Sequence, residues 1–381
     1  MSKPLVLTCD IGTQSARALL VDPDGRIVDV VQSKYAEPYF SKEPGWAEQK
    51  PNFYFDRLCE CCRELCARSN ALLPDVIAMT ITVIRDTVVC LDANNEPLRD
   101  IILWLDKRTV DPNGAMPAKN MMLFKVAGME PTAKVVYAAS VGNWIMRHEP
   151  EIWARTAKYV MLPTYLNYKL TGNLIDSASN QIGHIPFDYK NRRWMKPGSL
   201  TRCFCDVPNE KLCDLVPSGT VIGTITDEVC ALTGIPAGLP LISTGSDKGC
   251  ETLGLAVVDS DKASISLGTT ATIQFSTTEY VEPQQFLPAY PGVLNDHYNP
   301  EIEIYRGLWL LSWFVKEFGT ADAIDAKEKG IAPEALLDQR IRDLPAGSDG
   351  LLLQPYWTAG ILHPDSLGAV IGFSDYHTRY H

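Results

Sequence analysis

A short polar run near the start of the chain has the residue types that hold a metal-bound phosphate. Asp10 is followed by Gly12, Thr13, Gln14 and Ser15. A carboxylate can bind Mg²⁺ directly or through water, and a glycine-containing turn lets backbone N–H groups and hydroxyls approach phosphate oxygens closely. An ordinary solvated turn has the same composition, so the motif alone leaves both interpretations open.

The residues around this turn predict the hairpin that must position it. Leu5–Thr8 and Ala18–Val21 are apolar runs of strand length, one on each side of the turn. Pro23–Gly25 marks a second turn before another apolar run, Ile27–Val31. The pattern therefore predicts three consecutive antiparallel strands, with Asp10 at the end of the first.

The same arrangement recurs downstream. Ala263–Phe275 again contains a strand-like run that meets a small polar turn, made of Gly268, Thr269 and Thr270. Between the two copies, Pro240–Gly254 contains an apolar strand, then Gly245 and Asp247, then a predicted helix. The pair of hairpins is far more specific for phosphate binding than either one alone.

The two hairpins and the Gly-x-Asp element resemble the FGGY family of carbohydrate kinases, within the superfamily of actin-like ATPases. The resemblance implies an α/β, ribonuclease H-like fold with two domains around a cleft. Residues 1–244 would form the N-terminal domain, with the sugar side and the first hairpin. Residues 245–381 would form a C-terminal domain with the second hairpin. Because family members continue well beyond the segment His377–Arg379, the second domain is expected to be truncated and to lack its adenosine-binding part.

Two further segments resemble the acceptor side of these kinases. Glu43–Pro51 reads as a loop that exposes Trp46 and Glu48. Arg85 and Asp86 interrupt an apolar segment, where they either satisfy each other or hold vicinal hydroxyls, one donating and one accepting. The tripeptide Arg-Asp-Thr is nearer to the polyol kinases of the family than to its xylulokinases.

The resemblance implies an ATP-dependent phosphotransferase that moves the γ-phosphate to a hydroxyl of a sugar or polyol. Asp247 would be the general base and would contact the acceptor together with Trp46, Arg85 and Asp86, while Asp10 would organise Mg²⁺. The ATP-binding residues would be Gly12, Thr13, Gln14, Ser15, Arg17, Gly268, Thr269 and Thr270. Two alternatives stay open: an actin-fold ATPase without a sugar acceptor, and a catalytically inactive truncated kinase.

Composition agrees with this class. The 381 residues are 46% hydrophobic and 21% charged, enough for a sizeable core and two domains. A net charge of −11 argues against nucleic acid as a partner. No apolar run approaches bilayer length and no signal peptide precedes the first strand, so a cytoplasmic enzyme without a membrane partner is expected. A homodimer is compatible with the resemblance.

The chain contains 11 cysteines, an odd number that argues against a disulfide framework. Cys59, Cys62 and Cys66 share one face of the helix predicted after Pro51 and Asn52, and a single helix face cannot supply four tetrahedral ligands. We therefore expect buried structural thiols there, with Cys61 on another face.

Overall fold

The structure is a computed structural model that describes residues 3–268, 270–284, 287–358 and 366–381. Its contacts divide the chain into two compact units. Unit 1 comprises residues 1–259 and 276–300, and unit 2 comprises residues 260–275 and 301–381. The assignment of residues 1–244 and 245–381 to two functional domains stays a prediction.

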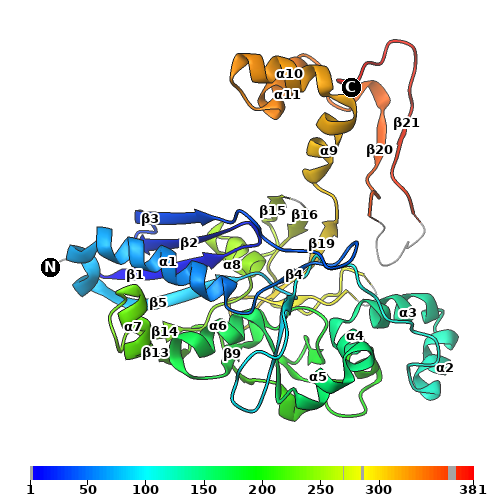
Figure 1. The fold of residues 1–381 in the computed structure, drawn as a ribbon. Coiled ribbons are helices and arrows are strands. Elements are labelled where there is room, and N and C mark those ends of the chain that lie inside the picture. The colour runs from blue at the N-terminus through cyan, green and yellow to red at the C-terminus, as the bar shows by residue number, and fades with distance from the viewer. Residues whose placement is uncertain (1–2, 269, 285–286, 359–365) are drawn as a thin grey trace. The chain divides into compact units, whose positions relative to one another are not determined.

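The centre of unit 1 is a six-stranded sheet in the order β13-β14-β5-β1-β2-β3 (Figure 1). In chain order these strands are β1 (Leu5–Ile11), β2 (Ser15–Val21), β3 (Ile27–Lys34), β5 (Val76–Val83), β13 (Val221–Thr224) and β14 (Pro240–Ile242). β1, β2 and β3 form the predicted antiparallel meander, while β1, β5 and β14 run parallel to one another. The carboxyl ends of these three parallel strands therefore meet at one edge of the sheet.

Helix α1 (Phe53–Arg68) covers one face of this sheet, and its buried face is apolar. The thiols of Cys59, Cys62 and Cys66 are buried there as expected. Cys61 is buried too, with its Sγ 3.6 Å from the carbonyl of Ala16 in β2, whereas Cys62 faces Cys9 in β1. Burial raises the pKa of the Cys59 thiol to about 12, which keeps it protonated and unreactive. Among the described residues, no cluster of side chains could hold a metal ion.

The rest of unit 1 adds a second, antiparallel sheet and a set of helices below the first. That sheet has the order β4-β7-β6-β8, with β4 at Glu48–Gln49, β6 at Val88–Leu91, β7 at Ile101–Ile102 and β8 at Lys158–Met161. The helices are α2 (Ala118–Val126), α3 (Glu130–Ala139), α4 (Val141–His148), α5 (Pro150–Arg155), α6 (Leu162–Thr171), α7 (Asp227–Thr233) and α8 (Asp247–Gly254). The short strands are β9 (Ile175–Ser177), β10 (Phe187–Asp188), β11 (Arg193–Trp194), β12 (Asp214–Val216), β17 (Tyr290–Pro291) and β18 (Tyr298–Asn299). No helix in the described part of the chain is both apolar and long enough to cross a bilayer.

Asp176 is a fully buried carboxylate in unit 1 that has only neutral hydrogen-bond donors. Thr164 Oγ1 donates to it at 2.8 Å, Asn180 Nδ2 at 2.8 Å and Gln181 Nε2 at 3.1 Å. Burial raises the pKa of Asp176 to about 6, although these donors oppose the rise.

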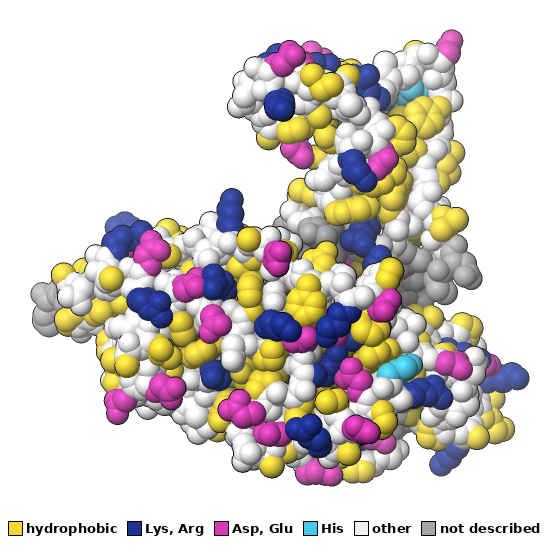
Figure 2. Space-filling model, viewed as in Figure 1, with side chains coloured by type: hydrophobic (Ala, Val, Ile, Leu, Met, Phe, Trp, Pro, Cys, Tyr) yellow, Lys and Arg dark blue, Asp and Glu magenta, His cyan; other side chains and the backbone are white. Residues whose placement is uncertain are grey.

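Unit 2 contains the second hairpin, β15 (Ser264–Leu267) and β16 (Ala271–Gln274), extended by β19 (Glu301–Ile304). Its other elements are α9 (Trp309–Phe318), α10 (Thr320–Lys329), α11 (Pro333–Ile341), β20 (Leu352–Gln354) and β21 (Ala369–Ile371). The buried Asp322 of α10 is held by two cations, with Arg379 Nε at 2.9 Å and Arg340 Nη1 at 3.0 Å. Figure 2 shows hydrophobic side chains gathered on the surface of β20 and β21. Leu352 and Ile371 are among the exposed ones.

Candidate active site

The turn after Asp10 retains donors that could bind an anion. The N–H of Gly12 closes the turn by donating to the carbonyl of Ser15 at 3.0 Å. Within the described part of the chain, the N–H groups of Thr13 and Gln14 have no hydrogen-bond partner. The side chain of Gln14 is exposed, whereas Ser15 is buried. The donors most available to a phosphate at this turn are therefore backbone amides, as in other anion-binding turns.

Asp10 itself is paired across the hairpin. Its Oδ2 accepts from Arg17 Nη1 at 2.7 Å, and the two residues lie opposite each other in the β1–β2 register. With its amide oxygen turned toward them, Gln32 also accepts from Arg17 Nη2 at 3.0 Å. The Asp10 side chain remains 35% exposed, so it can still reach a ligand.

Thr13 is fixed by a residue far away in the sequence. Trp104 Nε1 donates to Thr13 Oγ1 at 2.9 Å, and the Trp104 backbone N–H donates to the Thr87 hydroxyl at 3.3 Å. Thr87 directly follows Arg85 and Asp86. The first hairpin turn and the charged pair after β5 are thus joined through one tryptophan.

Asp247 begins α8 at the carboxyl end of β14. Ser246 caps this helix, because its hydroxyl accepts from the Gly249 N–H at 3.3 Å. Gly245 allows close packing before the helix, since a Cβ there would lie 2.7 Å from Val293 Cγ2. Asp247 Oδ1 accepts from the Lys248 N–H at 2.9 Å.

Burial raises the pKa of Asp247, and the positive charge of Arg85 opposes that rise. Arg85 follows β5 and Asp247 follows β14, and these two strands are parallel neighbours in the sheet. Thr82, which pairs with Asp10 in the sheet, donates from its hydroxyl to the carbonyl of Gly245 at 3.3 Å. One edge of the sheet in unit 1 therefore brings together Asp10, Arg85 and Asp247 from three adjacent parallel strands.

The printed contacts of Arg85 and Asp86 lead to two different rings of unit 1. The guanidinium of Arg85 lies over the Tyr290 ring, 5.3 Å from its centroid. Asp86 instead contacts His184, whose Nδ1 lies 2.8 Å from Asp86 Oδ2. No sequence pattern pointed to His184, because 98 residues separate it from its partner.

Trp46 packs against other side chains of unit 1. Its ring lies 3.9 Å from the guanidinium carbon of Arg108 and contacts Trp144 edge-on at 5.2 Å. Glu48, expected to be exposed, is fully buried, because its Oε1 accepts from Arg99 at 2.6 Å and Arg108 at 3.0 Å. That expectation was wrong for Glu48, and Trp46 keeps partial exposure.

The second hairpin has its turn at Gly268, whose N–H donates to the carbonyl of Thr270 at 2.9 Å. The Gly268 carbonyl accepts from the Leu308 N–H at 2.8 Å, which ties the turn to the start of α9. Thr269 lies outside the described residues.

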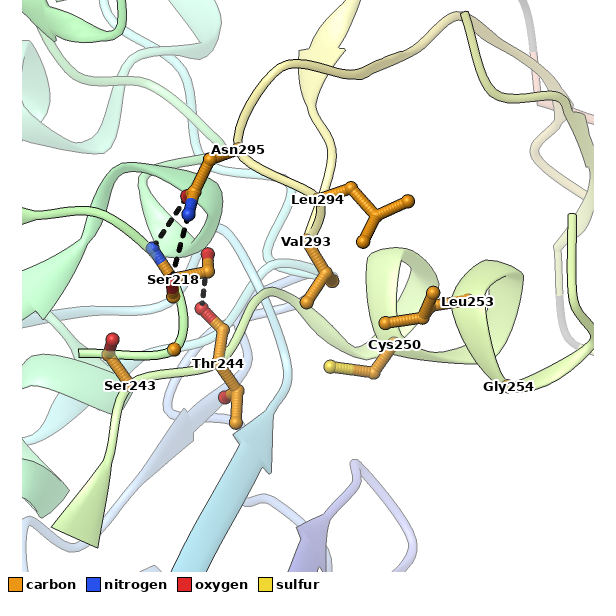
Figure 3. A pocket seen from close by; sticks show the side chains of 10 residues that line it. Ser218, Ser243, Thr244, Cys250, Leu253, Gly254, Val293, Leu294 and Asn295 are labelled. Carbon is orange, nitrogen blue, oxygen red and sulfur yellow. Dashed lines mark hydrogen bonds between the residues drawn. The ribbon is translucent and has the colours of Figure 1, made fainter. Parts of the chain in front are cut away.

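A pocket of about 500 Å³ lies beside α8 in unit 1 (Figure 3). It is lined by Ser218, Gly219, Ser243, Thr244, Cys250, Leu253, Gly254, Val293, Leu294 and Asn295. Asn295 points to Ser218, from whose N–H it accepts at 2.9 Å. These lining residues include no charged group.

Comparison with known proteins decides the family. The model of the N-terminal domain of the FGGY family of carbohydrate kinases matches residues 5–254. This chain belongs to that family. It is therefore a carbohydrate kinase, an ATP-dependent phosphotransferase with an α/β, actin-like ATPase fold.

Similar proteins agree with this family. An uncharacterized sugar kinase of Escherichia coli (strain K12), YgcE, is 26% identical over 374 residues, covering 98% of this chain and 68% of that protein. A xylulose kinase of Bacillus subtilis (strain 168) is 25% identical, covering 99% of this chain and 73% of the relative. The crystal structure of xylulose kinase from Rhodospirillum rubrum superposes with a TM-score of 0.78 at 25% identity, over 99% of this chain and 74% of that one.

Proposed function

We propose that this FGGY kinase transfers the γ-phosphate of ATP to a hydroxyl of an open-chain sugar or polyol, with Asp247 as general base. The observation that supports the proposal is the convergence of Asp10, Arg85 and Asp247 at one sheet edge. The raised pKa of Asp247 suits the role, because a base is most effective when its pKa approaches the working pH. Names of similar proteins include xylulose kinase and gluconokinase, a ketose and an aldonate kinase.

In the proposed reaction, Asp247 accepts the proton of the attacking hydroxyl as the bond to phosphorus forms. Arg85 holds the acceptor beside that carboxylate and Trp46 borders the same site. Thr13 and Gln14 donate backbone N–H groups to phosphate oxygens, with Gly12, Ser15 and Arg17 shaping the turn. Gly268 and Thr270, at the turn of the second hairpin, are proposed to bind phosphate as well.

The residues present fit Mg²⁺ carried by the nucleotide. Asp10 is a single exposed carboxylate already paired with Arg17, and a lone carboxylate is a poor site for a free ion. Mg²⁺ is commonly held by one or two carboxylates together with phosphates and water. When bound, the ion would neutralise charge that develops on the phosphates.

A screen of polyols, ketoses and aldonates with coupled detection of ADP tests this function. We expect ADP release that depends on one acceptor class. ADP release without any acceptor dependence would favour an actin-fold ATPase, and the absence of both turnover and nucleotide binding by calorimetry would favour an inactive kinase.

A further inference from the structure

Asp86 and His184 form a dyad at the carboxyl end of β5. The backbone N–H of His184 donates to Asp86 Oδ1 at 2.9 Å, and its ring Nδ1 lies 2.8 Å from Asp86 Oδ2. Each carboxylate oxygen thus already has a partner on the same residue. The carboxylate of Asp86 therefore has less hydrogen-bonding capacity left for an acceptor molecule than the sequence suggests.

The chain adopts costly backbone geometry to build this dyad. Asp86 has a φ of 49°, which is uncommon for a residue with a side chain. Gly183 has a φ of 140°, and a Cβ there would lie 2.2 Å from Asp86 Oδ1. Such geometry persists when the surrounding structure enforces it, and it is concentrated at ligand-binding sites.

Two tyrosines hold the dyad in place. The Tyr189 hydroxyl donates to the Gly183 carbonyl at 3.1 Å and accepts from the Gly183 N–H at 3.2 Å. The Tyr189 ring contacts Tyr290 at 5.7 Å, and Tyr290 lies beneath the Arg85 guanidinium. A series of contacts therefore runs from Gly183, which precedes His184, through the two tyrosines to Arg85.

The other ring nitrogen of His184, Nε2, is open to a ligand. It makes no hydrogen bond within the part of the chain that the structure describes, and the side chain is 32% exposed. We propose that His184, oriented by Asp86, is a specificity residue whose Nε2 hydrogen-bonds a second oxygen of the acceptor. The proposal rests on the function proposed above.

The chemistry of the dyad fits recognition of a hydroxyl. Because Nδ1–H donates to the carboxylate, Nε2 of the neutral ring accepts from a hydroxyl, while the protonated ring donates to a hydroxyl or carbonyl oxygen. Burial lowers the pKa of His184, but Asp86 outweighs burial and holds that pKa above its ordinary value. Asp86 is then a positioning residue and His184 contacts the acceptor.

Two substitutions of His184 separate these roles. His184→Asn keeps an N–H near Nδ1 for Asp86 and removes Nε2, whereas His184→Gln keeps a polar atom near Nε2 and loses the bond to Asp86. For the acceptor found in the screen, we expect His184→Asn to raise the acceptor KM by about 10- to 100-fold and His184→Gln to raise it less. The KM for ATP should change by less than about twofold. His148→Asn is the matched control, because the Nδ1 of His148 contacts the Trp144 carbonyl and not the Asp86 carboxylate.

A double substitution tests the positioning role of Asp86. If Asp86 acts through His184, then Asp86→Asn combined with His184→Asn should raise the acceptor KM no further than His184→Asn alone. This inference would be overturned if His184→Asn left the acceptor KM unchanged, or if it raised the KM for the acceptor and the KM for ATP equally. The proposed kinase function would still stand. If His184→Asn does not fold, an acceptor KM of His184→Gln equal to that of wild type would overturn it. A wild-type protein that phosphorylates no acceptor would overturn both proposals.

Discussion

The two hairpins have similar sequences but bury their apolar side chains to different extents. In unit 1, Leu7 of β1 is 1% exposed, because neighbouring strands and α1 cover the hairpin. In unit 2, the leucine in the matching strand, Leu267, is 61% exposed, and Ile265 and Ile273 face each other on the same exposed side of the sheet. A strand-turn-strand pattern thus specifies the turn, whereas burial depends on what packs against it.

The largest expected effect concerns Asp247, the proposed general base at the edge of the central sheet of unit 1. Asp247→Asn should lower kcat by about 10²- to 10⁴-fold, because the amide cannot accept the hydroxyl proton, with acceptor binding and folding kept. Steady-state kinetics and acceptor calorimetry check this. Asp227→Asn, at the start of α7, is the control, and wild-type turnover in Asp247→Asn would refute the base.

The difference in burial is tested by matched truncations. Leu7→Ala should lower the free energy of unfolding of unit 1 by about 2–5 kcal/mol, because it leaves a cavity in a packed core. Leu267→Ala should cost less than about 1 kcal/mol for unit 2. Denaturant unfolding measures both. Equal costs would mean that the exposed face of β15 and β16 is covered in solution.

One buried carboxyl in each unit should also respond oppositely to pH. Asp176 has a pKa of about 6, above the unfolded value near 3.9, so its favourable contribution is complete below about pH 4 and is lost as pH rises through 6. Relative to Asp176→Asn, wild type should lose about 2 kcal/mol of unfolding free energy between pH 4 and pH 7. If the unfolding free energies of wild type and Asp176→Asn changed in parallel with pH, this prediction would be contradicted.

Asp322 of unit 2 gives the opposite sign. Burial raises its pKa, but the bond from Arg379 and the charge of Arg340 outweigh burial and hold the pKa below its ordinary value. Its contribution is therefore present above about pH 4 and is lost as pH falls through the lowered pKa. Asp322→Asn should destabilise unit 2 at pH 7 and matter least in acid, as unfolding at both pH values would show.

The smallest expected effect distinguishes the binding of Mg-ATP from the binding of the acceptor. Asp10→Ala should weaken productive binding of Mg-ATP by about tenfold or more, with little change for the acceptor, because Asp10 is proposed to act through the metal. Nucleotide and acceptor titrations compare the two affinities. Asp24→Ala, at the next turn of the meander, is the control, and equal losses for both ligands would instead indicate a folding defect.

Local patterns predicted the β1–β2 hairpin, α1 and the position of Asp247, because each depends on residues close in sequence. His184, the burial of Glu48 and the contact between Trp104 and Thr13 were not predictable in this way. Each depends on a partner that the fold brings near: Asp86 lies 98 residues from His184, and Thr13 lies 91 residues from Trp104. Polar residues whose partners are distant leave no periodic signal.

The distribution of thiols gives this protein an internal reporter. All 11 cysteines lie between Cys9 and Cys250, whereas residues 260–275 and 301–381 contain none. Most of them are buried, and only Cys203, Cys230 and Cys250 are partly accessible. The rate at which a thiol reagent labels the remaining cysteines would therefore follow the opening of unit 1 alone, without any engineered probe.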